Sequence, residues 1–347
     1  MNNYIVTKTT KREKIFSGIQ PSGELHIGNY LGAIKSWVEL QDKHDVIYCV
    51  VDYHALTENP DPKIFKKQIF DAAVDLLAAG VDPKKSTLFA QSSRPEHTEL
   101  CWLLDTITNV AELQRVPTYK DKAERFAKSL NMGLLNYPVL MAADILIYEA
   151  TLVPVGEDQL PHIELTRELA ANFNRKFGQT FSEPKAYLTK GAKIMSLTQP
   201  EKKMSKSLGP DNYIALRDEP KIIREKIMKA VTDIGPQLRQ GFDGLTQKGG
   251  MSAGVANLFD LVKHFSKPEI LAGFTKKYNS GNLKYVELKE KLAEDIANYF
   301  APFRAKVKEL EAQPEKVHSI LLEAAEKLEA PAKAMLAIVK EKMGLGI

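Results

Sequence analysis

The sequence predicts an α/β fold: a Rossmann-like parallel sheet with helices on both faces, followed by an all-α C-terminal domain. Three short apolar runs, at 15–20, 46–51 and 87–90, each precede a stretch that carries a helical pattern. Strands that alternate with helices of this length form βαβ units with parallel strands. After Gly209 the β-branched runs disappear and only helical patterns remain. We therefore expect a sheet domain over 15–209 and a helical domain over 210–347.

Length and composition are those of an ordinary globular protein. The chain has 347 residues, of which 44% are hydrophobic and 27% charged, with a net charge of +4, and it is long enough for two domains. Cys49 and Cys101 have apolar neighbours and no metal-binding spacing, which argues against structural zinc and for a reducing compartment. No apolar run has the length of a membrane span, and residues 1–14 lack the apolar segment of a secretory signal. We expect a cytoplasmic protein with a flexible extension over 1–14.

The first half of the chain places several loops at one edge of the expected sheet. The strand over 15–20 is broken by Pro21-Ser22-Gly23, and a helix follows. Its apolar face is formed by Ile27, Leu31, Ile34 and Val38. The strand over 46–51 leads into Asp52-Tyr53-His54, and another helix follows Pro62. Right-handed crossovers put the carboxyl ends of such strands on the same rim.

A mainly helical insertion is expected over about 97–175. Within it, 151–155 has the pattern of a further strand, which ends in Gly156-Glu157-Asp158-Gln159, and a helix follows over 161–175. Beyond the loop at 202–209 we expect helices near 218–231, 252–265, 267–277, 285–312 and 314–342.

The loop Lys202-Lys203-Met204-Ser205-Lys206-Ser207-Leu208-Gly209 is rich in cations and hydroxyl groups. It holds three lysines within five residues, and Pro200 and Pro210 flank it, which favours a loop. Lysine ammonium and serine O–H groups can close on an anion whose charge grows during a reaction, such as departing pyrophosphate. Taken alone, a lysine cluster of this kind is also typical of a solvated basic loop.

A second stretch, Gln20 to Asn29, lies where a strand hands over to a helix. Gly23 and Gly28 allow the backbone to come near a ligand, and the free N–H groups of the new helix favour an anion. His26 can donate a hydrogen bond to a phosphate oxygen. The stretch is neither a Walker loop nor GxGxxG. By itself it also fits a structural turn, with the histidine as a helix cap.

Three further places could hold ligand groups. Gly156-Glu157-Asp158-Gln159 follows a strand and could contact a ribose, or it could simply cap the next helix. Asp144 lies in the apolar run 140–147, so its carboxylate needs a partner, which is either structural or the polar N–H of an otherwise apolar ligand. His54 is near the same rim, where it is either a ligand contact or a packed core histidine.

Together these stretches resemble a class I aminoacyl-tRNA synthetase. His26-Ile27-Gly28-Asn29 is similar to the HIGH motif of that class, and Lys203-Met204-Ser205-Lys206-Ser207 matches the KMSKS motif at every position. The sequence is most similar to the bacterial-type tryptophanyl-tRNA synthetase family over roughly residues 15–347. Further stretches with this resemblance are Phe16–Gly23, Tyr137-Pro138, Leu140–Leu146, Val153–Gln159, His162–Arg167 and Ala230–Asp233.

These patterns and the resemblance imply a set of site residues. ATP is expected at Gln20, Pro21, Ser22, His26, Gly28, Asn29, Gly156, Glu157, Asp158, Ile194, Lys203, Met204, Ser205, Lys206 and Ser207. Tryptophan is expected at Asp144, which would accept the indole N–H, and at Phe16, Gly18, His54, Tyr137, Met141, Val153, Val155 and Gln159. Catalysis would depend on Lys203, Ser205, Lys206 and Gln20. Mg²⁺ is expected through the ATP phosphates rather than through protein ligands.

The resemblance also implies the reaction and the partners. Tryptophan would be activated by ATP and transferred to its tRNA by a homodimer whose interface is formed in part by the insertion, with the helical domain reading the anticodon. A tyrosyl-tRNA synthetase shares the fold and both motifs and remains an alternative. So do a tRNA-independent adenylyltransferase and a non-catalytic RNA-binding paralogue.

Overall fold

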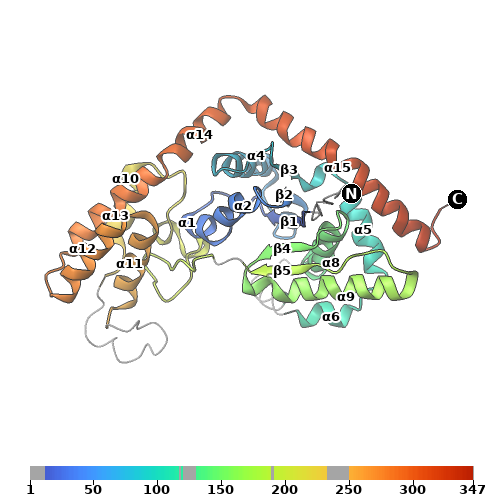
Figure 1. The fold of residues 1–347 in the computed structure, drawn as a ribbon, viewed down its shortest axis with the longest axis horizontal. Helices are drawn as coiled ribbons and strands as arrows, with labels where there is room; N and C mark the ends of the chain where they lie inside the picture. The colour runs from blue at the N-terminus through green and yellow to red at the C-terminus, as the bar shows by residue number, and fades with distance from the viewer. Residues whose placement is uncertain (1–11, 117–118, 120–129, 189–190, 233–249, 347) are drawn as a thin grey trace, which may run out of the picture.

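The computed structural model of the chain describes residues 12–116, 119, 130–188, 191–232 and 250–346 (Figure 1). At the centre of this part of the chain is a parallel sheet of five strands in the order β3-β2-β1-β4-β5. The strands are Lys14–Ile19 (β1), Asp45–Val50 (β2), Ser86–Ala90 (β3), Leu152–Val155 (β4) and Lys185–Leu188 (β5). The strands expected near 15–20, 46–51, 87–90 and 151–155 are confirmed.

The strand order places a topological switch between β1 and β4. The chain builds outward from β1 to β3, and then returns to add β4 and β5 on the other side of β1. In open parallel sheets, ligands bind in the crevice outside the carboxyl ends of the strands at such a point. The sheet topology therefore marks the end of β1 and the end of β4 as the place for a site.

Alternate residues of the strands face two separate cores. Tyr48 and Val50 face the first core, while Ile47 and Cys49 face the second, and all four are buried. Helices cover both faces, which explains why the strands are apolar runs without alternation. The helices of this part are α2 (Lys35–Leu40), α3 (Asp52–Leu56), α4 (Pro62–Ala78), α5 (Glu96–Asp105), α6 (Val110–Arg115), α8 (Met132–Leu146) and α9 (Leu160–Phe177).

The helix expected over 27–38 contains a change of helical type. It starts as α1 (Ile27–Asn29), continues as a π-helical stretch over Tyr30–Ile34, and ends as α2. Ile27 and Ile34 are fully buried in the first core, as the apolar spacing predicts. π-Helical stretches are uncommon and often occur at functional sites.

In the range 97–175, for which the sequence predicts mainly helices and one strand, the strand is β4. It pairs with β1 through Ile15 and Leu152 and so belongs to the sheet itself. The helices α5 and α8 in this range pack on the second face of the sheet, where Leu104 and Val139 are buried. The sequence pattern identified the strand, but only the pairing shows that it lies next to β1.

Beyond the lysine loop the described chain is helical. Its helices are α10 (Pro220–Lys229), α11 (Ala253–Phe265), α12 (Pro268–Asn279), α13 (Tyr285–Tyr299), α14 (Ala301–Glu311) and α15 (Pro314–Lys342). The single helix expected over 285–312 is wrong, because the chain breaks between α13 and α14 at Phe300. Pro302 lies in the first turn of α14, where its missing N–H does no harm. Phe300 is buried in the first core at the break.

Within the helical domain expected over 210–347, the last helix packs on the sheet. Figure 1 shows α14 and α15 running from the helical bundle across the top of the sheet domain. The apolar stripe of α15, which includes Ala325, Leu328, Ala332 and Leu336, is buried in the second core together with Phe89 of β3. The last helix therefore covers the sheet, and the chain returns to the first domain.

Among the described residues, no helix has both the length and the apolar character that crossing a membrane requires. Residues 1–11 of the expected extension lie outside the described residues, and Lys14 already belongs to β1.

Candidate functional site

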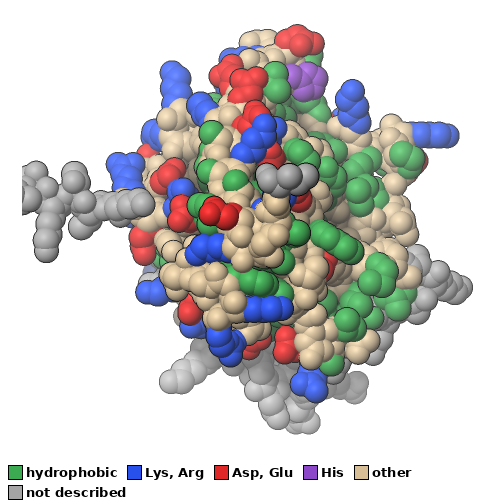
Figure 2. All heavy atoms as spheres, turned by 90° about the vertical axis from the view of Figure 1, so that its right-hand side faces the viewer, with side chains coloured by type: hydrophobic (Ala, Val, Ile, Leu, Met, Phe, Trp, Pro, Cys, Tyr) green, Lys and Arg blue, Asp and Glu red, His purple; other side chains and the backbone are tan. Residues whose placement is uncertain are grey.

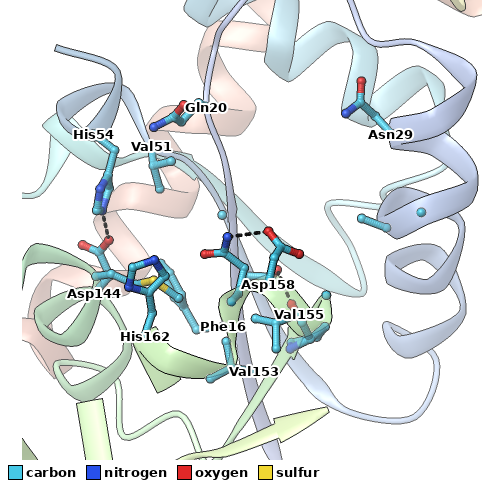
Figure 3. Close-up of a pocket in the computed structure, with 18 of the residues that line it drawn as sticks. Phe16, Gln20, Asn29, Val51, His54, Asp144, Val153, Val155, Asp158 and His162 are labelled. Carbon is cyan, nitrogen blue, oxygen red and sulfur yellow. Dashed lines mark hydrogen bonds and ion pairs between the residues drawn. The ribbon is translucent and has the colours of Figure 1, made fainter. Parts of the chain in front are cut away.

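A cavity of about 530 Å³ lies at the switch point, at the carboxyl ends of β1 and β4 (Figure 3). Gly18 and Gln20 from the end of β1 line it, as do Val155 and Gly156 from the end of β4. The helices α1, α3 and α8 supply further walls. The cavity therefore lies where the sheet topology predicts a ligand site.

The cavity collects every residue that the sequence assigned to the amino acid. Phe16, Gly18, His54, Tyr137, Met141, Asp144, Val153, Val155 and Gln159 all line it. Most of this wall is apolar, and its polar side chains come from α3, from α8 and from Gln159 in the turn after β4. A largely apolar pocket with a few convergent polar groups suits a flat ring that carries one N–H.

Asp144 accepts more side-chain hydrogen bonds than the other residues assigned to the amino acid. Its side chain accepts from His54 Nε2 at 2.9 Å through Oδ2, and from Gln91 Nε2 and His97 Nδ1 through Oδ1, both at 2.7 Å. Burial by itself would raise the pKa of Asp144, but the hydrogen bonds from His54 and His97 outweigh it and hold the pKa below its usual value. Asp144 is therefore an ionised carboxylate although only 1% of it is exposed.

A second polar contact joins α8 to α9. Tyr137 Oη is 3.2 Å from His162 Nε2, and both rings line the cavity. His162 follows β4 on α9 and was not assigned to the site from the sequence. Its signal was a histidine on the first turn after Gly156–Gln159, within a stretch that had been noted only for its resemblance.

The two motif stretches meet in space. Lys206 Nζ donates to the backbone oxygens of Ser22 at 2.7 Å and Glu24 at 3.2 Å. Gly23 has φ +92, and a Cβ there would lie 3.7 Å from Lys206 Nζ. A residue with a side chain would be strained in this conformation. Residues that are 184 positions apart in the chain are thus in direct contact.

Backbone hydrogen bonds hold the two motif stretches close together. Ile27 N donates to Ile214 O at 3.0 Å, and Leu216 N donates to Leu25 O at 2.8 Å. The segment after the lysine loop therefore runs beside the strand–helix junction. The loop itself is anchored by Met204, which is buried in the first core and donates its N–H to Ile194 O at 2.9 Å.

His26 acts as a helix cap. Its Nδ1 accepts from Gly28 N at 3.1 Å and Asn29 N at 3.3 Å, while Asn29 Oδ1 accepts from His26 N. Burial, together with the charges of Lys206 and Lys203, lowers the pKa of His26 to about 4. The ring is therefore neutral at pH 7 and its Nδ1 is an acceptor, so a role as donor is left to Nε2. His26 does not line the cavity.

The residues assigned to ATP divide into three groups. Gln20, Gly28, Asn29, Gly156, Asp158 and Lys203 line the cavity. Pro21 and Ser22 line a neighbouring hollow of about 170 Å³, which they share with Gln20. His26, Glu157, Ile194, Met204, Ser205, Lys206 and Ser207 line neither.

The residues of the third group lie in different surroundings. Ile194 and Met204 are buried behind the loop. Ser205 Oγ accepts from Ser207 N at 3.3 Å and so caps a short 3₁₀ turn. Burial lowers the pKa of Lys206, and the charges of Glu24 and Asp75 partly oppose this.

The sequence analysis missed two kinds of site residue. Ser17, Gly32, Ala33, Trp37, Val51, Glu58, Ile145, Pro154 and His162 line the cavity without having been assigned to it. Gln91 and His97, which hold Asp144, lie outside the cavity wall, and nothing in the local pattern connects them to residue 144. The one available signal was that Gln91 directly follows a buried strand.

Comparison with known proteins agrees with this geometry. A family model described as class I tRNA synthetases (W and Y) matches residues 8–301. The tryptophan–tRNA ligase of Caldanaerobacter subterraneus subsp. tengcongensis is 45% identical over 335 residues, which cover 96% of this chain and 98% of that protein. The tryptophan–tRNA ligase of Helicobacter pylori (strain ATCC 700392 / 26695) is 43% identical over 336 residues, covering 96% and 99%.

Solved structures give the same result. Tryptophanyl-tRNA synthetase from Campylobacter jejuni, complexed with ADP and tryptophan, has a TM-score of 0.83 and 34% identity, covering 96% of this chain and all of that one. A tyrosyl-tRNA synthetase from Archaeoglobus fulgidus has a TM-score of 0.65 at 21% identity, covering 86% and 91%, and so shares the fold.

Proposed function

The chain belongs to the family of class I tRNA synthetases for tryptophan and tyrosine, and we propose that within this family it is a tryptophan–tRNA ligase. One observation carries this choice. A buried, ionised Asp144 lines a cavity with a largely apolar wall, and the contact between Lys206 and Ser22 brings the lysine loop to the strand–helix junction, whose Gln20 and Gly28 line the same cavity.

Recognition of tryptophan would depend on Asp144. A carboxylate has about four acceptor positions, of which three are already used by protein donors. The remaining position on Oδ2 can accept an indole N–H. Phenylalanine would leave this acceptor unpaired, and a site of this kind rejects such a ligand by about 10⁴–10⁵.

Activation of tryptophan would need no enzymic base. The carboxylate oxygen of tryptophan attacks the α-phosphorus of ATP, a P–O bond forms, and the bond to the β-phosphate breaks to release pyrophosphate. The amino acid is already ionised at pH 7, so the chain has to align the reactants and stabilise the charge that develops on pyrophosphate. Lys203, Lys206 and Ser205 would supply the cations and the hydroxyl for this.

Mg²⁺ would act with these lysines. In the described residues no group of three His, Cys, Asp or Glu side chains is arranged to hold a metal ion. Phosphate oxygens and water would therefore be its main ligands, which is the usual arrangement for Mg²⁺ on nucleotides. When bound, the ion would neutralise phosphate charge.

In the second step the adenylate passes its acyl group to the 2′-hydroxyl of the terminal adenosine of tRNA, with AMP as the leaving group. The helices α10 to α13 would contact the anticodon end. We also propose a homodimer in the cytoplasm. Figure 2 shows apolar side chains gathered on part of the face that it draws. Trp102 of α5, Val110 of α6 and Met132 of α8 are 69%, 57% and 73% exposed.

The alternatives are weaker. The likeness to a tyrosyl enzyme is one of fold, whereas relatives at 43–45% identity over almost the whole chain are tryptophan–tRNA ligases. An adenylyltransferase without tRNA would have no use for the helical region. The match to the tryptophan–tRNA ligases covers nearly their full length and so includes this region.

Amino-acid-dependent exchange of pyrophosphate into ATP tests the proposal. With all twenty amino acids tried separately, tryptophan should support exchange far better than any other, and aminoacylation of total tRNA should then load tryptophan. Exchange that depends on tyrosine, or exchange without any tRNA loading, would contradict the assignment.

A further inference from the structure

We propose that Gln91 and His97 are positioning residues that orient Asp144 toward the amino acid. The proposal rests on the proposed function and concerns residues outside the cavity wall. Gln91 follows β3, and His97 lies in the first turn of α5. Both side chains are 0% exposed. We call Gln91, His97 and Tyr148 the Asp144 clamp.

Gln91 and His97 contact Oδ1 of Asp144 and leave Oδ2 to the cavity side. Gln91 and His97 both donate to Oδ1, so the acceptor positions of that oxygen are filled. Oδ2 has a single protein donor, His54, which itself lines the cavity. Figure 3 shows Asp144 and His54 together at the edge of the pocket. The free acceptor position thus lies on the oxygen that a ligand can approach.

Proton positions in the clamp run in one direction. An ionised carboxylate can only accept, so His97 Nδ1 must donate to it. In the tautomer with the proton on Nδ1, Nε2 is an acceptor, and Tyr148 Oη, which is 2.7 Å away, can donate to it. Asp144 and Tyr148 therefore favour the same tautomer of His97.

The orientation of Gln91 is evidence that its amide serves Asp144. Its Oε1 is buried and has no hydrogen-bond partner among the described residues. Turning the amide over would place this oxygen against the carboxylate, where two acceptors would repel. Gln91 is thus held with one polar atom unsatisfied, a costly arrangement that the charged hydrogen bond offsets.

A selective loss of tryptophan recognition would show that Gln91 and His97 orient Asp144 and do not merely pack against it. The probe is the sulfur analogue of tryptophan, 3-(1-benzothiophen-3-yl)alanine, which keeps the ring shape and lacks the N–H. Pyrophosphate exchange gives kcat/KM for both amino acids in wild type, in Gln91→Met and in His97→Leu. His97→Asn, whose amide can replace the Nδ1 donor, is the matched control.

We expect Gln91→Met and His97→Leu each to lower kcat/KM for tryptophan about tenfold or more, because each removes a hydrogen bond to a charged group. The value for the sulfur analogue should change less than about threefold, and His97→Asn should stay within about threefold of wild type. The KM for ATP should be unchanged in all of them. Equal losses for both amino acids would show a merely structural role and overturn the proposal.

Three further outcomes are decisive. If Gln91→Met or His97→Leu does not fold by circular dichroism, Gln91→Asn, which keeps an amide but is too short to reach Oδ1, replaces it. It should lower the preference for tryptophan over the analogue, and an unchanged preference would overturn the clamp. A wild-type enzyme that uses tryptophan but does not prefer it to the analogue would overturn the clamp and leave the proposed function standing. A wild-type chain without tryptophan-dependent exchange would contradict the proposed function itself.

Discussion

Two buried aspartates lie on opposite faces of the sheet, and their environments differ. Asp144 accepts hydrogen bonds from three side chains, and its pKa lies below the usual value. Asp75, on α4, contacts Arg217 Nε at 2.6 Å and accepts from the backbone of Leu25. Burial nevertheless raises the pKa of Asp75 to about 6, although Arg217 opposes this. Each of the two carboxylates is 1% exposed.

The difference teaches that burial alone does not set the charge of a carboxylate. Three short hydrogen bonds stabilise the ionised form of Asp144 more than desolvation disfavours it. Asp75 instead joins distant parts: Leu25 lies in the strand–helix junction, and Arg217 follows the lysine loop and also pairs with Glu311 of α14. One carboxylate therefore lines the cavity, where we propose that it binds the amino acid, and the other ties the helical region to the sheet domain.

Asp144→Ala should have the largest effect. Without the acceptor, only the shape of the pocket distinguishes tryptophan from phenylalanine or tyrosine, so discrimination should fall from about 10⁴–10⁵ toward about 10². The KM for tryptophan should rise. Pyrophosphate exchange with the three amino acids measures this. Asp42→Ala, which removes an exposed carboxylate far along the chain, is the control, and selectivity that survives Asp144→Ala would reject the role of this residue.

Lys206→Ala should slow adenylate formation roughly 100-fold or more, because loss of one donor to a developing anion costs about 2.7–4 kcal/mol. Tryptophan affinity should be nearly kept, since Asp144 is untouched. Single-turnover kinetics and tryptophan binding separate the two effects. Lys202→Ala is the matched control, because Lys202 is exposed and donates to Gln199 rather than to the junction. Equal losses of rate and affinity would count against this assignment.

Asp75 should make stability fall as the pH rises. Its folded-state pKa of about 6 lies above the value of 3.8 that an unperturbed aspartate has. Its contribution is therefore complete below about pH 4 and is lost as the pH rises through 6. The contribution to the free energy of unfolding that is lost in this way amounts to about 3 kcal/mol. Urea unfolding of wild type and Asp75→Asn between pH 4 and 7 should show the variant gaining relative stability with pH, and a constant difference would disprove it.

Substitution of Asp42 should have the smallest effect on stability, and it serves as the reference for exposed carboxylates. It pairs with Lys85 at 2.8 Å, and its side chain is 58% exposed. Exposed pairs of this kind contribute little and are screened by salt. Asp42→Asn should leave the urea midpoint unchanged within error at every pH tested. A clear shift would mean that surface pairs contribute as much as the buried ones in this protein.

Much of the fold could be predicted because its signals are local. The apolar runs that became β1 to β4 and the spacing of Ile27, Leu31 and Ile34 each lie within a few residues of one another. The break at Phe300 was missed because the apolar pattern continues across it. The position of α15 was missed because its apolar stripe does not say which surface it will cover.

The sequence by itself determined the chemistry at each motif: the cations of the lysine loop, the turn at Gly23 and a carboxylate in an apolar run at Asp144. Tertiary structure decided which of these groups meet and in what state. Asp144 is held by Gln91 and His97, which are 53 and 47 residues away, and Asp75 meets Arg217 across 142 residues. Periodicity describes the neighbours of a residue along one element, whereas charge state and orientation depend on donors that reach it from other elements.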